Sequence, residues 1–294
     1  MIYEITHTTT YDYLNAVALS HHLLRLHPRE SRPQRVLTHH LQLDPRPTII
    51  QSHVDYFGNS VRCVTVEGSH RRLIVRASSK VMTGLALRPL PQETPSWQTV
   101  RDSCRGAQIG AALEASDFLF DSPLIRTREE YGDYALPSFP ADRPLLEGIN
   151  DFTRRIHHDF KFDPKATTLA TPLEQVFKSR RGVCQDFAHL QIACLRSLGL
   201  PARYVSGYLE TQPPPGQARL MGADASHAWV SVYCTGLGWV DVDPTNNVMP
   251  TTRHVTVAWG RDYSDVSPIR GVILGSGEHQ LKVAVDVVPV PDSD

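Results

Sequence analysis

The first 85 residues alternate between apolar and polar positions in short runs, a pattern typical of β-strands that bury one face. Turn-forming residues separate the runs, for example Phe57-Gly58-Asn59. We expect strands at residues 3–11, 36–43, 49–54, 60–66 and 73–81. They predict a small, mainly antiparallel β domain, for which a sandwich is one arrangement.

Residues 85–143 show no sustained period, and repeated prolines interrupt them. We interpret this region as a connector with short helical turns, one of them near residues 111–120. The domain boundary is expected between residues 120 and 142. The N-terminal β-rich domain with its connector is therefore assigned to residues 1–140.

From residue 142 onward, apolar residues recur at i, i+3 and i+4, which is the period of an amphipathic α-helix. Asp142 and Pro144 mark its start, because aspartate caps helices and proline fits the first turn. Further helices are expected at 171–177 and 183–198, the second one ending before Gly199. Strands are expected to follow at 202–209, 227–234, 239–242, 255–259 and 281–288.

The segment Pro213–Gly216 lies between the first two of these later strands. It belongs to a loop of about seventeen residues that we expect to be exposed and mobile. Helices followed by strands predict an α+β core. We assign this core, together with the C-terminal strands, to residues 141–294.

The chain has 294 residues and a formal net charge of −1, from 30 Lys and Arg against 31 Asp and Glu. Without a basic excess, nucleic acids and membrane surfaces are not expected partners. No apolar run reaches the ~18 residues of a spanning helix, and the N-terminus lacks the basic and apolar segments of a secretory signal. We therefore expect a cytoplasmic protein, while its oligomeric state stays open.

Five cysteines without a C-x-x-C pair predict reduced thiols rather than a disulfide framework or a zinc knuckle. Cys184 stands apart because it opens a predicted helix, where unpaired N–H groups and the helix dipole favour a thiolate. The same N–H groups would stabilise an oxyanion beside the sulfur. The surrounding patterns predict core positions for Cys63, Cys194 and Cys234, and an incidental surface thiol for Cys104.

A nucleophilic cysteine needs a base and a residue that orients the base. His227 opens one predicted strand and Asp243 closes the next, with a short turn between them. A loop of two or four residues would place these side chains on opposite faces, whereas a three-residue loop would make them diagonal neighbours on one face. We therefore predict an odd-length loop or a bulge, with Gly238 as its left-handed residue.

Four segments carry a resemblance to a known family: Gly-Val-Cys-Gln-Asp-Phe-Ala-His-Leu at 182–190, Leu-Gly-Leu-Pro-Ala-Arg-Tyr-Val-Ser-Gly-Tyr-Leu at 198–209, His-Ala-Trp-Val at 227–230 and Gly-Trp-Val-Asp-Val-Asp-Pro-Thr-Asn at 238–246. In order and spacing they are similar to the core of the bacterial transglutaminase-like superfamily of papain-type cysteine enzymes. Further segments resemble the β domain that precedes this core in bacterial proteins, and their C-terminal segment: His-Thr-Thr-Thr-Tyr at 7–11, Leu-Arg-Leu-His-Pro-Arg at 24–29, Asp-Tyr-Phe-Gly-Asn at 55–59 and Gly-Arg-Asp-Tyr-Ser-Asp-Val-Ser-Pro at 260–268.

The resemblance implies a papain-like or transglutaminase-like core, with helices packed on an antiparallel sheet, preceded by a mainly antiparallel β domain. It also implies a catalytic triad of Cys184, His227 and Asp243. In this triad Cys184 attacks an amide or ester carbonyl, His227 activates the thiol and protonates the leaving group, and Asp243 holds the imidazole.

Three polar residues near the triad are expected to be structural. They are Asp186 as a carboxylate at the helix start, His189 as a packed or hydrogen-bonded histidine, and Asp241 as a solvated or hydrogen-bonded strand residue. Eukaryotic transglutaminases add an upstream tryptophan to the oxyanion site, but no tryptophan lies between residues 98 and 228 here. This departure argues against cross-linking, and Gln175 is only a weak candidate for the second oxyanion donor.

The expected function is that of a thiol-dependent cysteine peptidase or amidase acting on a peptide or amide substrate. Acyl transfer to an amine stays open, because acceptor choice depends on cleft shape and water exclusion rather than on the triad. The alternatives are a non-catalytic binding or assembly module with a papain-like fold, and an acyltransferase resembling the arylamine N-acetyltransferases. No cofactor is expected, and no metal either, because Cys184, His227 and Asp243 could ligate zinc but lack a fourth ligand.

Overall fold

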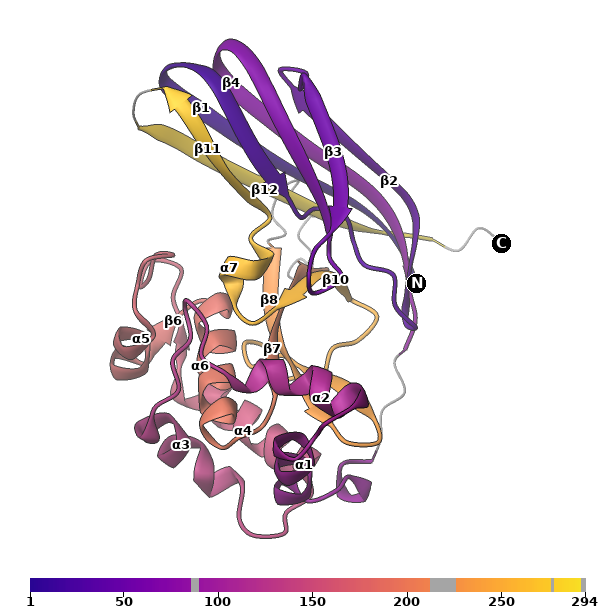
Figure 1. Cartoon of the computed structure of the whole chain (residues 1–294), viewed down its shortest axis with the longest axis vertical. Helices are drawn as coiled ribbons and strands as arrows, with labels where there is room; N and C mark the ends of the chain where they lie inside the picture. The colour runs from indigo at the N-terminus through magenta and orange to yellow at the C-terminus, as the bar shows by residue number, and fades with distance from the viewer. Residues whose placement is uncertain (86–89, 212–225, 276–277, 292–294) are drawn as a thin grey trace, which may run out of the picture.

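The computed structural model describes all residues except 86–89, 212–225, 276–277 and 292–294. A curved antiparallel sheet is stacked on a mixed α/β lobe (Figure 1). The expected α+β class, with a β-rich region ahead of the core, is confirmed. Among the described residues, no helix is both long and apolar enough to cross a membrane.

The N-terminal sheet is built on two long strands, β1 (Ile2–Leu24) and β4 (Ser60–Thr83), which pair along most of their length. On the outer side of β4, β2 (Gln34–Asp44) pairs with one half and β3 (Ile49–Val54) with the other half. The sequence pattern predicted shorter strands, because polar residues interrupt the alternation where β1 and β4 continue.

Irregularities in β1 between Asp12 and Val17 and between Val17 and Leu19 bend this sheet, because an extra residue in one strand increases the local twist. The two halves of the bent sheet share one apolar cluster, formed by Tyr13, Val17, Leu24, Leu26, Leu43, Val64, Val66, Leu73, Val75 and Ala77. The N-terminal strands therefore form a single bent sheet, and the sandwich that the sequence analysis considered is not formed.

The last two strands, β11 (Ile269–Gly275) and β12 (His279–Val290), both pair with β1. This pairing corrects the assignment of the C-terminal strands to the core at residues 141–294. Val285 and Val287 of β12 are buried beside the buried positions of β1, so β12 extends its core-facing side. Of the two, only β12 was predicted as a strand, at 281–288, and it was assigned to the nearer domain because alternation identifies a strand but not its partner.

The connector contains three short helices, α1 (Trp97–Arg105), α2 (Gly110–Ser116) and α3 (Glu129–Ala135). Single 3₁₀ turns at residues 91–93, 117–119 and 136–138 lie between and beside them. The helical turn expected near residues 111–120 is confirmed as α2 and the 3₁₀ turn that follows it.

The core lobe contains α4 (Leu145–Asp159), α5 (Leu173–Ser179) and α6 (Cys184–Ser197), close to the three helices expected from the sequence. Asp142 does not cap α4. It adopts a left-handed conformation with φ of 60°, and Pro144 is the residue that precedes the first helical turn.

The core sheet has the order β10-β7-β8-β9 and is antiparallel throughout. Its strands are β7 (Ala202–Leu209), β8 (Ser226–Cys234), β9 (Gly238–Val242) and β10 (His254–Gly260). A short parallel pair, β5 (Lys161–Phe162) and β6 (Arg181–Gly182), precedes α6, and α7 (Tyr263–Val266) follows β10. The loop predicted around Pro213–Gly216 lies outside the described residues.

One arginine of the N-terminal region, Arg29, and one of the core sheet, Arg203, lie over tryptophan rings of the core sheet. The guanidinium of Arg29 lies 3.4 Å from the ring centroid of Trp259 on β10. Arg203 on β7 lies 3.8 Å from the same centroid and 4.2 Å from that of Trp239 on β9. Burial lowers the pKa of Arg203 to about 9, and the two ring faces provide part of the solvation that water would otherwise supply.

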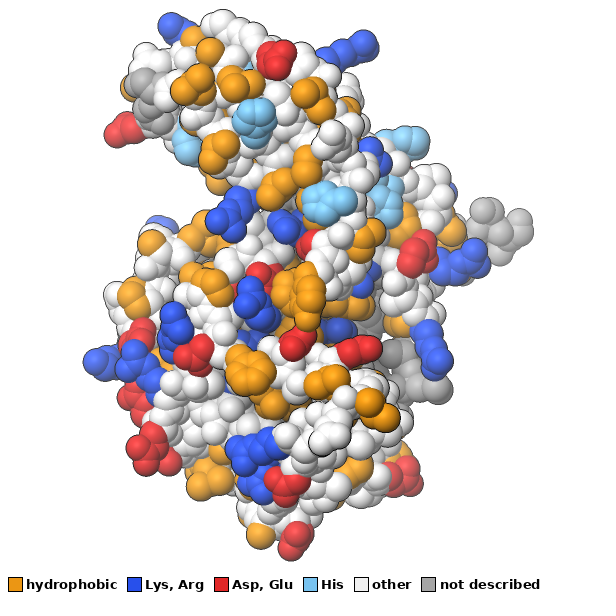
Figure 2. All heavy atoms as spheres, viewed as in Figure 1, with side chains coloured by type: hydrophobic (Ala, Val, Ile, Leu, Met, Phe, Trp, Pro, Cys, Tyr) orange, Lys and Arg blue, Asp and Glu red, His pale blue; other side chains and the backbone are white. Residues whose placement is uncertain are grey.

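Charged side chains of both signs are interspersed over the face in Figure 2. A cavity of about 590 Å³ opens where the lobes meet, and sheet, connector and C-terminal residues all line it. Its ion pairs, Arg25 with Asp55 at 3.1 Å and Arg261 with Asp265 at 2.9 Å, join residues within the cavity wall itself. Opposite charges therefore neutralise one another there.

Candidate active site

Cys184 is the first residue of α6 and is partly exposed. The chain is guided to this point by the β5–β6 pair, in which Asp163 N–H donates to Gly182 O at 2.9 Å. A side chain at Gly182 would come within 2.6 Å of Asp186 Oδ2, so only glycine fits there without displacement. This close approach fixes the sulfur at the helix start.

Asp186 closes the first turn of α6, as the sequence predicted. Its Oδ2 accepts hydrogen bonds from Val183 N–H at 2.8 Å and from the Thr167 hydroxyl at 2.6 Å. Burial raises the pKa of this carboxyl group, while the two hydrogen bonds oppose that effect. Asp186 therefore stabilises the approach to Cys184.

The hairpin of β8 and β9 has the register that the sequence analysis required. Cys234 pairs with Gly238, and the register continues to Val230 opposite Val242, so the loop has three residues. Gly238 has a φ of 83°, in the left-handed region where glycine is favoured. The prediction of an odd-length loop is confirmed, and it places residues 227 and 243 on one face.

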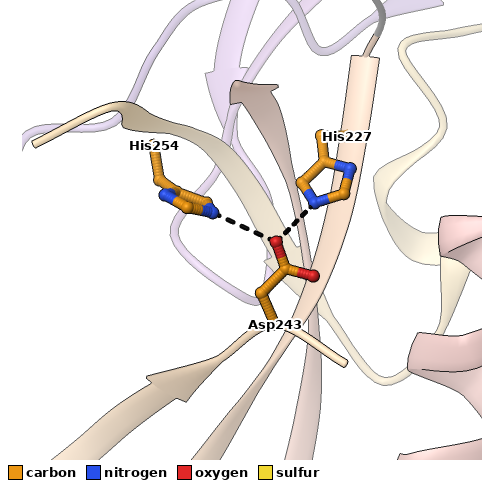
Figure 3. Close-up of side chains that lie close together, drawn as sticks. All are labelled: His227, Asp243 and His254. Atoms are coloured by element: carbon orange, nitrogen blue, oxygen red, sulfur yellow. Dashed lines mark hydrogen bonds and ion pairs between the residues drawn. The ribbon is translucent and has the colours of Figure 1, made fainter. Parts of the chain in front are cut away.

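This register brings His227 Nε2 to 2.7 Å from Asp243 Oδ2 (Figure 3). Burial alone would lower the pKa of His227. Hydrogen bonds with Asp243 and with Cys184, together with the electrostatic interactions of His227 with both groups, outweigh it and raise the pKa of His227 to about 10. The structure thus brings all three predicted site residues together.

Asp243 is fully buried and remains ionised because several donors surround it. Its Oδ1 accepts from the backbone N–H groups of Thr245 and Asn246 at 2.9 and 3.2 Å. Its Oδ2 accepts from Asn246 Nδ2 at 2.7 Å in addition to His227. The pKa of Asp243 is raised by burial but lowered more strongly by its hydrogen bonds with histidine and Asn246, so it lies well below the usual range.

His254 is a member of this cluster that the sequence analysis missed. Its Nε2 lies 3.2 Å from Asp243 Oδ2, and its side chain is almost fully buried (Figure 3). His254 opens β10, whereas Asp243 follows β9, and these strands lie at opposite edges of the core sheet. The sequence contained no local signal for this meeting, because it depends on the path of the chain between the two edges.

Other polar residues near the site have the structural roles expected of them. Asp241 Oδ2 accepts a hydrogen bond from Trp229 Nε1 at 3.0 Å. His189 is buried, and its Nε2 accepts from Tyr263 N–H at 3.1 Å. Gln175 is exposed on α5, so its position gives no support for a role in the oxyanion site.

Two of the expectations for the remaining cysteines are wrong. Cys104 is buried rather than a surface thiol, because α1 turns it with Trp97 and Val100 into the core. Cys63 is only partly buried, and its sulfur lies 3.7 Å from His53 Nδ1 on the neighbouring strand. Cys194 and Cys234 are core residues, as predicted.

His227, Asp243 and His254 offer three ligand atoms within 4.8 Å of one another. The number and type of these atoms would suit a divalent cation. The 2.7 Å separation between His227 and Asp243 is, however, a hydrogen-bond distance. Two ligands of a tetrahedral zinc ion lie about 3.3 Å apart. The arrangement therefore fits a hydrogen-bonded cluster better than a metal site.

Comparison with known families identifies two regions of the chain. Residues 3–82 match the bacterial transglutaminase-like N-terminal region, and residues 139–244 match the transglutaminase-like superfamily. The second match contains the three clustered residues Cys184, His227 and Asp243. The first covers the long strands of the N-terminal sheet but not its C-terminal strands.

Relatives and solved structures agree with these matches. The chain is 40% identical to an uncharacterized protein of Mycobacterium tuberculosis, over 98% of this chain and 92% of that protein. It is 35% identical to a protein-glutamine gamma-glutamyltransferase of Pseudomonas aeruginosa, over 31% of this chain and 15% of that enzyme. A Cytophaga hutchinsonii structure named “putative cysteine protease” has the same fold, with a TM-score of 0.76, 22% identity, and coverage of 100% of this chain and 92% of that one.

Proposed function

The chain belongs to the transglutaminase-like superfamily, and from that membership we propose that it is a thiol-dependent amide-processing enzyme that forms an acyl-enzyme on Cys184. The observation that carries the proposal is the set of contacts around His227, which hydrogen-bonds with Asp243 on one side and with Cys184 on the other. Nucleophilic catalysis by cysteine requires an activated thiol, here at a helix start, a base beside the thiol, and a group such as a carboxylate that orients the base.

Each nitrogen of His227 has a separate task in this proposal. Nε2 is occupied by Asp243, which leaves Nδ1 as the nitrogen that serves Cys184. The protonated imidazole beside the sulfur favours the thiolate, which is the nucleophilic form of cysteine. Asp243 is buried and held by further donors, so it keeps the ring in one orientation throughout the reaction.

In acylation, the Cys184 sulfur forms a bond to the amide carbon and the carbonyl oxygen takes up the negative charge. The Cys184 N–H belongs to the first helical turn, whose N–H groups lack intrahelical acceptors, so it is a suitable donor to this oxygen. The intermediate then collapses and its C–N bond breaks. The leaving amine takes the proton of His227 Nδ1, and a thioester remains on Cys184.

In deacylation, His227 Nδ1 removes a proton from water as the water oxygen attacks the thioester carbon. The C–S bond breaks, a carboxylic acid leaves, and the thiolate–imidazolium pair is restored.

We favour water over an amine as acceptor. The reason is the absence of a tryptophan between residues 98 and 228, which distinguishes this chain from the eukaryotic transglutaminases.

A panel of chromogenic or fluorogenic peptide amides, glutaminyl amides and isopeptides tests the proposal, each with and without an added primary amine. We expect a Cys184 acyl adduct in intact-mass spectra and release of free acid as the main product. Cys184→Ala should abolish both. Cys63→Ser is a matched control, because Cys63 also lies beside a histidine, and this variant should behave as the wild type.

The possible results of the panel separate the candidate functions. Amine adducts as the main product would identify a transferase and overturn the preference for hydrolysis. Turnover restricted to thioester donors would favour an acyltransferase. If no donor acylates Cys184, the proposal is wrong, and a non-catalytic binding module becomes the better description.

A further inference from the structure

The second histidine of the cluster, His254, has a defined protonation pattern. Its Nδ1 faces the backbone N–H of Thr251, at 3.3 Å. A backbone N–H can only donate, so Nδ1 must be the acceptor and carries no proton. In the neutral ring the single proton is therefore on Nε2, which points at Asp243 Oδ2. His254 donates a hydrogen bond to this carboxylate without adding a charge.

This protonation pattern is the reverse of that of a metal ligand. A histidine that binds a metal through Nε2 carries its proton on Nδ1 and donates it to an acceptor. At His254 the group facing Nδ1 is a donor. Metal binding would thus place two N–H groups against each other, whereas hydrogen bonding to Asp243 satisfies every group in the cluster.

Asp243 is held from two directions by elements that are not neighbours in the sheet. Asn246 and Thr245 come from the turn that follows β9, and His254 comes from β10 at the far edge. The ring of His254 also packs edge-on against Trp229, with centroids 5.3 Å apart. Trp229 in turn is hydrogen-bonded to Asp241, so the orientation of His254 is itself constrained.

We propose that His254 is a positioning residue of the active site, which holds Asp243 through its Nε2–H so that Asp243 can orient His227. The inference rests on the proposed function, because it assigns His254 a role in orienting the catalytic base. His254 acts through Asp243. The alternative is that His254 only fills space against Trp229.

Two substitutions separate these roles. His254→Phe keeps a ring against Trp229 but removes the donor. His254→Gln restores an amide N–H that can reach Asp243. His7→Phe is a matched control, since His7 is also a buried histidine packed against an aromatic ring, that of Tyr208, at a centroid distance of 5.7 Å.

Nuclear magnetic resonance of protein labelled with ¹⁵N-histidine provides a readout that needs no substrate. In the wild type we expect His254 to show a protonated Nε2 and an unprotonated Nδ1. In His254→Phe we expect the pKa of His227 to shift by about one pH unit, because the Asp243 oxygen that both histidines contact loses one of its donors. His254→Gln and His7→Phe should leave the titration of His227 near that of the wild type.

With any substrate found in the panel, His254→Phe should lower kcat about 10-fold with little change in KM, and His254→Gln should recover most of that loss. A protonated Nδ1 on His254 would overturn the proposal even if every variant failed to fold. So would a His227 titration in His254→Phe equal to that in His7→Phe, or a His254→Gln variant as impaired as His254→Phe. Failure of every donor to acylate Cys184 would instead refute the proposed function while leaving these measurements readable.

Discussion

Two cysteines of this protein lie beside a histidine, and their surroundings differ in every other respect. Cys184 is at the start of α6, and its partner His227, whose side chain is 10% exposed, lies against the buried carboxylate of Asp243. Cys63 is near the start of the long strand β4, 3.7 Å from the exposed imidazole of His53 on β3. A thiol next to an imidazole is thus common to both pairs.

The two pairs differ in the group that hydrogen-bonds with the imidazole and in the position of the sulfur relative to a helix. His227 is fixed by a buried carboxylate and the sulfur of Cys184 lies at the positive end of a helix. His53 is exposed, and water screens its electrostatic effect on Cys63. The comparison teaches that orientation and burial, rather than proximity alone, make a thiol–imidazole pair suitable for catalysis.

The largest expected effect is that of removing the carboxylate from the Cys184 pair. Asp243→Asn keeps the shape but no longer stabilises the protonated ring of His227, and kcat should fall about 10³- to 10⁴-fold, as in other triads. Steady-state kinetics on the substrate identified in the panel measures this, with His53→Ala as the control that should leave kcat unchanged. A loss of less than 10-fold would mean that the carboxylate is not part of the machinery.

A smaller effect is expected in the reactivity of the two thiols. Iodoacetamide at neutral pH should alkylate Cys184 about 10- to 100-fold faster than Cys63, because only Cys184 has a helix start and a protonated histidine beside it. Peptide mapping after short exposures gives both rates in one sample. Cys104 is not a useful reference, since it is buried. Equal alkylation rates for Cys184 and Cys63 would show that the helix start and His227 do not make Cys184 more reactive.

His227 and the buried histidines of the N-terminal sheet should respond to pH in opposite directions. Burial lowers the pKa of His7, His22 and His39 to about 4, so the unfolded chain binds more protons below pH 6.5, and the sheet loses stability as the pH falls toward 4. For His7 this amounts to something on the order of 3 kcal/mol at most.

The pKa of His227 is raised, so its contribution is fully present below pH 6.5 and is lost as the pH rises toward 10. Thermal unfolding measured between pH 4 and pH 10 should therefore show the highest stability at intermediate pH, with stability falling toward both ends of this range. His7→Gln should flatten the acid side and His227→Gln the alkaline side. Acid sensitivity that persists unchanged in His7→Gln would show that this histidine is not a source of it.

The smallest effect is expected at the surface pair. Cys63→Ser and His53→Ala should each change the free energy of unfolding by no more than about 0.5 kcal/mol, because an exposed pair of this kind contributes little. Chemical denaturation measures this. A loss of several kcal/mol would indicate that the pair is part of the sheet's packing, and would weaken its use as a control.

Local patterns were sufficient to predict most elements and the central geometry of the site. The periodicity around Phe152 and the Gly199 stop signal predicted the core helices, and hairpin geometry predicted that an odd-length loop is needed to place His227 and Asp243 on one face. These features depend on residues close in sequence. Such residues are linked by helix and hairpin geometry, which has few solutions.

Long-range features could not be predicted in the same way. His254 opens β10 and Asp243 follows β9, at the opposite edge of the core sheet, yet their side chains meet within hydrogen-bond distance. Cys104 is buried because the face of α1 that carries it packs against the core. The strand predicted at 281–288, which is β12, was assigned to the wrong domain because alternation does not specify a partner, and β11 was not predicted. In each case the decisive contact is between segments that sequence patterns treat separately.

The pairing of β12 with β1 also has a consequence for how the chain folds. Ile2 lies opposite Val290, so the whole core lobe is inserted between two strands of one sheet. Loop-closure entropy makes pairings of such separation slow to form. During synthesis, the edge of β1 that pairs with β12 stays unpaired until the core lobe has been synthesised. Folding of the core lobe should bring the two distant segments together, which makes completion of the sheet the last step and the folded core its template.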